Sequence, residues 1–126
     1  MKSRSLLKSF QYALQGLKAA YIGEKNFRIH CIAVVLVVIC GVLFGLSIER
    51  WVLLVLTIAF VLVCEVFNTV AETLADMITQ EYSPQAKKVK DLAAGAVLIS
   101  AIAAVLVGAF IFIEPALACL KTIFGM

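Results

Sequence analysis

Residues 51–76 read WVLLVLTIAFVLVCEVFNTVAETLAD, an apolar run that ends in a line of polar side chains. The first fourteen residues of this stretch carry no charge. The next twelve place four polar residues at spacings of three, four and four, namely Glu65, Asn68, Glu72 and Asp76. At roughly 100° per residue, these four side chains, here called the polar stripe, fall within an arc of about 80° on one helical face. Carboxylates at a membrane border are costly, so the polar stripe indicates a site for ions, protons or phosphates.

The composition indicates a membrane protein. The chain has 126 residues, of which 63% are hydrophobic, and its mean hydropathy of +1.07 lies well outside the range of soluble domains. Uncharged runs at residues 31–48, 51–64 and 92–113 each approach the length of about 20 residues that spans a bilayer. No small-residue cleavage pattern follows the first run, so we interpret it as a retained span rather than a signal peptide.

The segment before the first span has the pattern of an amphipathic helix that lies on a membrane surface. Large apolar residues recur there at intervals of four, four, three and four, namely Leu6, Phe10, Leu14, Leu17 and Tyr21. We therefore predict one all-α membrane domain over residues 1–126. Its parts are a surface helix and corner at 1–28 and helical spans at about 29–48, 51–78 and 91–113.

Two connections are expected between the spans. The first is a tight turn from Ser47 to Arg50, which joins the first span to a second helix that begins at Trp51. The second lies at residues 81–85, where Pro84 breaks the long second helix and a short polar loop begins.

The distribution of lysine and arginine predicts the orientation. Nine of these residues precede the first span or lie between the second and third spans: Lys2, Arg4, Lys8, Lys18, Lys25, Arg28, Lys87, Lys88 and Lys90. Only Arg50 and Lys121 fall on the other side. The N-terminus and the second loop are therefore expected in the cytoplasm. This charge suits anionic head groups or a phosphate-bearing ligand, and it does not argue for nucleic acid.

The polar stripe can support phosphate chemistry. Glu65 and Glu72 are two helical turns apart with Asn68 between them on the same side. Such a face can supply a general base, a hydrogen-bonding amide and a hard metal ligand in one line. The alternative is a purely structural role, in which polar side chains join helices inside a bundle.

A second charged group precedes the third span, formed by Lys87, Lys88, Lys90 and Asp91. The lysines alone are explained by the usual positive flank of a cytoplasmic loop. Asp91, next to Lys90 at the helix entrance, could cap the helix or contact the adenine and ribose of a nucleotide.

Two further polar residues lie near the first span. Glu24 is either a solvated surface acid or, with Glu72, a ligand to one divalent cation. His30 is interpreted as an interface residue rather than a metal ligand. The four cysteines form no CxxC pair and are expected to be free thiols, and the chain has no Walker A, GxGxxG or zinc-site spacing.

The quoted motif at residues 65–76, together with AKKVKDLAAGAVL at residues 86–98, resembles the signature of the bacterial integral-membrane diacylglycerol kinase and undecaprenol kinase family. The resemblance extends to GLKAA at residues 16–20 and EKNFR at residues 24–28. It implies a homotrimer of three-span subunits in the bacterial inner membrane. Such an enzyme moves the γ-phosphate of Mg-ATP to a lipid hydroxyl at the cytoplasmic surface.

The resemblance also implies roles for particular residues. Glu65 is the expected general base, with Asn68 beside it as a catalytic residue, and Glu24 and Glu72 are the expected Mg²⁺ ligands. Further contacts with the ATP site are expected from Asp76 and from Tyr12, Glu81, Tyr82, Ser83, Lys90 and Asp91. The family's N-terminal arginine contacts phosphate, but Arg4 lies one residue out of the expected register with Tyr12, so its role stays open.

Residues 26–30, Pro84 and the Ala-Ala-Gly-Ala stretch at 93–96 resemble the Gram-positive members of the family more closely. This resemblance implies undecaprenol as the lipid substrate. Diacylglycerol is the alternative lipid. Alternatives from other classes are a small protein that handles cations or protons and a structural helper of membrane assemblies. The Lys90 and Asp91 pair argues against an ion pathway. A pathway should also have polar residues across the whole span, yet the segment 52–64 offers only Thr57.

Overall fold

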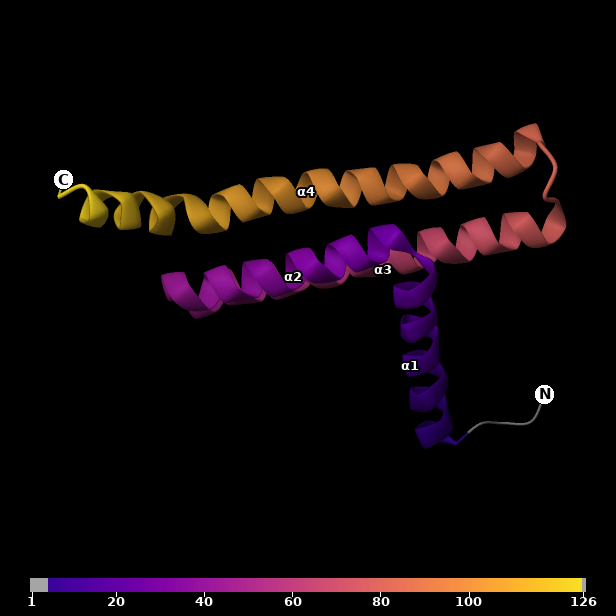
Figure 1. The fold of residues 1–126 in the computed structure, drawn as a ribbon, viewed down its shortest axis with the longest axis horizontal. Coiled ribbons are helices and arrows are strands. Elements are labelled where there is room, and N and C mark those ends of the chain that lie inside the picture. Colours follow the sequence, from indigo (N-terminus) through magenta and orange to yellow (C-terminus); the bar gives the residue numbers. More distant parts are fainter. Residues whose placement is uncertain (1–4, 126) are drawn as a thin grey trace.

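The computed structural model describes residues 5–125, which form four α-helices joined by short connections. The helices are α1 (Leu6–Gly23), α2 (Lys25–Phe44), α3 (Ile48–Ile78) and α4 (Pro84–Ile123). Helices α2, α3 and α4 run along one another, whereas α1 projects sideways from this bundle (Figure 1). The all-helical class is confirmed. Arg4, whose role was left open, lies outside the described residues.

Three helices, α2, α3 and α4, are long and apolar enough to cross a membrane. At about 1.5 Å per residue, the 31 residues of α3 extend about 46 Å and the 40 residues of α4 extend about 60 Å. Both exceed the hydrocarbon thickness of about 30 Å. The ends of α3 and α4 that meet at residues 79–83 therefore have enough length to project beyond the apolar layer.

Serine hydroxyls define where the helices begin. Ser47 accepts a hydrogen bond from the backbone N–H of Arg50 at 3.4 Å, so α3 begins at Ile48. The expected turn at residues 47–50, with a helix beginning at Trp51, is wrong for this reason. The turn instead occupies residues 45–47, where Gly45 adopts the left-handed conformation with φ of 63° and closes α2.

The expected break at Pro84 is also corrected by the structure. Pro84 is the first residue of α4, and Ser83 caps it by accepting from the N–H of Ala86 at 3.4 Å. Proline suits the first turn of a helix because its fixed φ is already helical and its missing N–H has no partner to lose. The connection between α3 and α4 is therefore residues 79–83, and α4 starts seven residues before the span expected at 91.

Arg28 fixes the corner between α1 and α2. Its guanidinium Nη1 donates to the carbonyls of Tyr21 at 2.9 Å and Ile22 at 2.8 Å. These carbonyls lie in the last turn of α1, where backbone acceptors lack helical partners. Glu24 between the two helices is extended, with φ of −119° and ψ of 112°. The charge of Arg28 thus stabilises the change of direction that sends α1 away from the bundle.

The apolar core lies toward the end of the bundle farthest from residues 79–83. Leu46, Leu54 and Ile111 are buried there, and Trp51 packs against them. The Trp51 ring lies so close to Gly41 that a Cβ added at this glycine would stand 2.7 Å from its Cη2 atom. This close approach joins α2 to α3 and fixes the turn between them.

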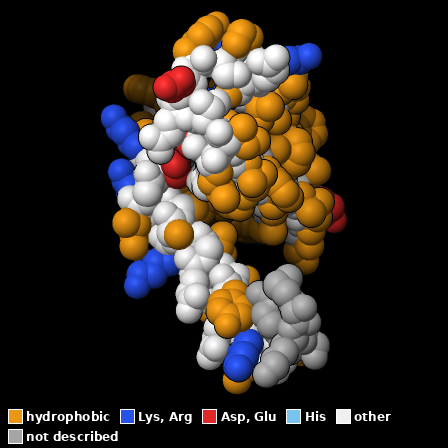
Figure 2. Space-filling model, turned by 90° about the vertical axis from the view of Figure 1, so that its right-hand side faces the viewer, with side chains coloured by type: hydrophobic (Ala, Val, Ile, Leu, Met, Phe, Trp, Pro, Cys, Tyr) orange, Lys and Arg blue, Asp and Glu red, His pale blue; other side chains and the backbone are white. Residues whose placement is uncertain are grey.

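Most apolar side chains of the described residues remain exposed on the single chain. Figure 2 shows hydrophobic side chains over much of the bundle on this face, with few charged groups among them. Helices α3 and α4 pack along each other extensively, whereas α2 contacts α3 more sparsely and α4 hardly at all. An apolar surface of this extent requires lipid or further protein to cover it.

Candidate functional site

The polar stripe on α3 meets partners from both neighbouring helices. At one end, an oxygen of Glu65 (Oε1) lies 2.9 Å from Nε2 of His30 on α2. At the other end, Asp76 accepts a hydrogen bond from Nζ of Lys90 on α4 at 2.6 Å. The predicted helical face therefore points toward α2 near the middle of the bundle and toward α4 near its end. The polar stripe joins three helices.

Glu65 is buried in this arrangement, with 3% of its side chain exposed. Its neighbours along the helix are those of the apolar run, so the carboxylate has little access to water. A buried carboxylate is unfavourable unless it is paired or hydrogen-bonded. The imidazole of His30, which is 26% exposed, supplies this partner.

Asn68 and Glu72 form the centre of the polar stripe. The Asn68 amide donates from Nδ2 to Oε1 of Glu72 at 3.2 Å. The other amide atom of Asn68, Oδ1, is buried and has no hydrogen-bond partner within the described chain. Because native proteins seldom leave such an atom unpaired, this oxygen is available to a group that binds beside Glu72. Amide and carboxylate oxygens are ligands that Mg²⁺ prefers.

Lys90 carries a persistent positive charge at the end of the polar stripe. Its hydrogen bond with Asp76 raises the pKa of Lys90 above its ordinary value of 10.5. Desolvation opposes this rise, and the charges of Asp76 and Glu72 support it. Lys90 lies before the uncharged run of α4, in the part of the helix that is long enough to project beyond the apolar layer of the membrane. Lys90 is therefore protonated at neutral pH and stands where a phosphate can be neutralised.

Asp91 has a different partner from the one that the sequence suggested. It pairs with Lys87, one helical turn earlier, while the neighbouring Lys90 binds Asp76. Nor does Asp91 cap the helix, because α4 begins at Pro84 with Ser83 as its cap. Capping requires a position just before the first turn, and Asp91 lies two turns inside.

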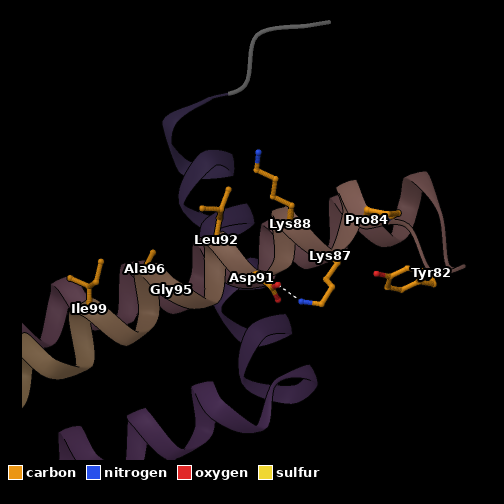
Figure 3. A pocket seen from close by; sticks show the side chains of 9 residues that line it. All are labelled: Tyr82, Pro84, Lys87, Lys88, Asp91, Leu92, Gly95, Ala96 and Ile99. Atoms are coloured by element: carbon orange, nitrogen blue, oxygen red, sulfur yellow. Dashed lines mark hydrogen bonds and ion pairs between the residues drawn. The ribbon is translucent and has the colours of Figure 1, made fainter.

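Beside this pair, the surface of α4 forms an open groove of about 670 Å³. The ring of Tyr82 and the pair of Lys87 and Asp91 bound one end, and the small residues Gly95 and Ala96 leave room farther along (Figure 3). Lys88 points to the other side of the helix from Lys87 (Figure 3). The groove thus combines an aromatic ring and charges at one end with an apolar floor at the other.

The remaining predicted site residues lie in three separate parts of the chain. Glu81 and Tyr82 are exposed in the connection between α3 and α4, and the hydroxyl of Ser83 is engaged as the helix cap. Tyr12 lies on α1 and is about half exposed. Glu24 is half-buried at the start of α2 and makes no side-chain capping bond.

Within the described residues, Glu24 and Glu72 are not joined in a metal-binding group. Across residues 5–125, no cluster of three or more His, Cys, Asp or Glu side chains could hold a metal ion. A Mg²⁺ site here would therefore depend on one or two carboxylates together with other oxygen ligands.

His30 is the site residue whose role the sequence did not reveal. Its position at a helix interface follows the expectation, but its pairing with Glu65 was not anticipated. The available signal was that this single histidine lies within the first turns of an apolar span, where an isolated ionisable group needs a partner.

The chain is similar in sequence to a known protein family and to several of its members. A family model described as prokaryotic diacylglycerol kinase matches residues 11–112. A diacylglycerol kinase of Synechocystis sp. is 41% identical over 114 residues, which cover 90% of this chain and 65% of that protein, slightly under two thirds of its length. The undecaprenol kinase of Bacillus subtilis is 40% identical over 106 residues, 84% of this chain and 86% of the relative. A diacylglycerol kinase of Escherichia coli is 34% identical over 101 residues, 80% and 83% of the two chains.

Proposed function

Because the chain belongs to the prokaryotic diacylglycerol kinase family, we propose that it is a lipid kinase that transfers the γ-phosphate of ATP, with Mg²⁺, to the hydroxyl of a membrane lipid. The observation that carries this proposal is the polar stripe. It runs from the buried Glu65 to the protonated Lys90 bound at Asp76, a rise of about 16 Å along α3. A lipid alcohol would meet its apolar end and a nucleotide its charged end.

Each residue of the polar stripe has a chemical task in this reaction. Phosphoryl transfer depends mainly on alignment and on neutralising the charge of the phosphates. Glu65 would accept the proton of the lipid hydroxyl, and the Asn68 amide would orient groups beside it. Lys90, held by Asp76, would offset negative charge on the nucleotide. ATP would be bound around the charged end of the polar stripe by the other predicted nucleotide contacts, namely Tyr12, Glu81, Tyr82, Ser83 and Asp91.

The residues present fit the Mg²⁺ that the family implies. Glu72 supplies a carboxylate, and the unpartnered Oδ1 of Asn68 lies in the same cluster. We propose that Glu72 and Glu24 hold the ion together with phosphate oxygens, since Mg²⁺ commonly takes one or two protein carboxylates. When bound, the ion supplies charge neutralisation at the transferred phosphate.

We further propose that the chain lies in the bacterial inner membrane with its N-terminus and site on the cytoplasmic side. The uneven distribution of lysine and arginine supports this orientation. Helix α1 would lie on the membrane surface, because Leu6, Phe10, Leu14, Leu17 and Tyr21 are all about half or more exposed on it.

A homotrimer is the proposed assembly. Two observations support it, namely the exposed apolar faces of α2, α3 and α4 and the sparse contacts of α2 within its own chain. The described residues of the single chain hold no cluster of three or more possible metal ligands, which is in keeping with a site completed by a second copy.

Undecaprenol is the proposed lipid, with diacylglycerol as the alternative. The relative named undecaprenol kinase matches this chain over more of its own length than the similarly identical relative named diacylglycerol kinase. An ion pathway is not supported, because Thr57, the one hydroxyl-bearing residue at positions 52–64, donates its proton to the Leu53 carbonyl at 2.7 Å.

The test is phosphate transfer from labelled ATP with magnesium, using purified protein in mixed micelles with undecaprenol and diacylglycerol offered separately and then together. Preference for undecaprenol supports the proposal as stated, and preference for diacylglycerol replaces the lipid. Labelling of neither lipid by folded protein would contradict the kinase function.

A further inference from the structure

The contact between His30 and Glu65 links two helices that otherwise pack sparsely. Nε2 of His30 on α2 lies 2.9 Å from Oε1 of Glu65 on α3. Within residues 5–125, no other side chain is in hydrogen-bond or ion-pair contact with this carboxylate. The orientation of Glu65 is therefore set by one imidazole.

Because Glu65 is buried, the loss of its contact with His30 would be costly. Glu65 is 3% exposed, so its charge cannot be satisfied by water without a change in the packing. Loss of one partner from a buried pair leaves an unpaired charge, which is more costly than loss of an exposed contact. A carboxylate without its imidazole would be free to turn away from the lipid hydroxyl, and it would then serve poorly as a base.

His30 also borders an apolar cavity of about 170 Å³ between α2, α3 and α4. The other lining residues include Val34, Val37, Leu54 and Ile58. The imidazole therefore borders apolar space in addition to the carboxylate. Truncation of His30 to alanine would open space continuous with this cavity.

We propose that His30 is a positioning residue for phosphate transfer. Its Nε2–H holds Oε1 of Glu65, which leaves the second carboxylate oxygen to face the lipid hydroxyl. This inference rests on the proposed function. In the step, the lipid oxygen forms a bond to the γ-phosphorus, the bond from that phosphorus to the bridging oxygen of ADP breaks with its electron pair leaving on ADP, and the hydroxyl proton passes to Glu65.

The first test does not depend on activity. The chain contains a single histidine, so ¹⁵N NMR of the imidazole in protein purified without a histidine tag reports on His30 alone. The Glu65→Gln substitution removes the partner charge and is expected to shift the Nε2 resonance. Imidazole signals identical in the two proteins would overturn the proposal.

The second test is kinetic. The His30→Ala variant is expected to lose kcat on the order of 10- to 100-fold, the range for a hydrogen bond to a charged group, with KM for ATP near the original value. His30→Gln keeps an N–H donor and should retain activity within a few fold. Free imidazole should restore part of the activity of His30→Ala, because it can enter the opened cavity.

Val34→Ala is the matched control, since Val34 lines the same cavity on the same helix without pairing with Glu65. It should keep kcat. A loss in Val34→Ala equal to that in His30→Ala, or a His30→Gln variant as inactive as His30→Ala, would overturn the positioning role. A wild-type protein that phosphorylates no lipid would instead contradict the proposed function, while full activity in His30→Ala would leave that function standing and remove His30.

Discussion

Lys90 and Asp76 join α4 to α3 through a hydrogen bond of 2.6 Å at the charged end of the polar stripe. Both side chains are partly exposed, at 41% and 52%, so solvent screens the pair and it adds little to the free energy of unfolding. We propose that its importance is functional, because the charges of Asp76 and Glu72 both act on the ammonium group of Lys90.

The Lys90→Met substitution tests this role. We expect kcat/KM for ATP to fall by about 10²-fold, as when one preorganised donor to a transferred phosphate is removed, with little change in thermal stability. Steady-state kinetics with varied ATP and a thermal melt measure the two effects. Lys121→Met is the control, because Lys121 is exposed in the last turn of α4, far along the helix from Lys90, and forms no ion pair in the described chain. Equal losses in both variants would contradict a specific role for Lys90.

The cluster of Asn68 and Glu72 predicts a change in magnesium dependence. Asn68→Ala removes the unpartnered Oδ1 as well as the amide that donates to Glu72. We expect the magnesium concentration for half-maximal activity to rise by about tenfold or more, the scale on which supporting ligands affect metal binding. A magnesium titration at saturating ATP measures it. Thr73→Ala should leave the titration unchanged, because the Thr73 hydroxyl donates to the Thr69 carbonyl instead. An unchanged titration for Asn68→Ala would remove Asn68 from the site.

Gly41 should be sensitive to the smallest substitution. An added Cβ would lie 2.7 Å from the Trp51 ring and 3.2 Å from Leu46, so the ring must move. Overpacking of this kind costs about 1–3 kcal/mol in the free energy of unfolding. Because Trp51 is the single tryptophan, its fluorescence should also change. At Gly16, where a Cβ meets nothing within 4 Å, alanine should be neutral or slightly stabilising. A Gly41→Ala variant as stable as the parent would show that the close approach is not required.

The sequence predicted the features that depend on local pattern. Apolar runs of membrane length predicted the all-helical fold, and the spacing of three, four and four placed Glu65 and Asp76 on one face of a helix. The starts of α3 and α4 were predicted less well, because they depend on whether Ser47 and Ser83 cap a helix or sit in a loop. Hydropathy does not distinguish these two possibilities.

The partners across helices could not be predicted from spacing. Lys90 and Asp91 are adjacent in sequence, yet on a helix they point about 100° apart, so one binds Asp76 and the other binds Lys87. The pairing of His30 with Glu65 depends in the same way on how α2 is rotated against α3. Whether Glu24 and Glu72 share an ion depends on how distant parts of the sequence meet, within one chain or across an interface, and periodicity carries no information about this.

The most direct test of the account is the rate of ATP-dependent lipid phosphorylation by the Glu65→Gln variant. Glutamine keeps the size and a hydrogen-bonding oxygen but cannot accept the hydroxyl proton, so turnover should fall by about 10²- to 10⁴-fold while the protein stays folded and assembled. Glu49→Gln, the same chemical change in the first turn of α3, should retain full activity. Substantial turnover in folded Glu65→Gln would contradict the role of Glu65 as the base and, with it, the proposed organisation of the site.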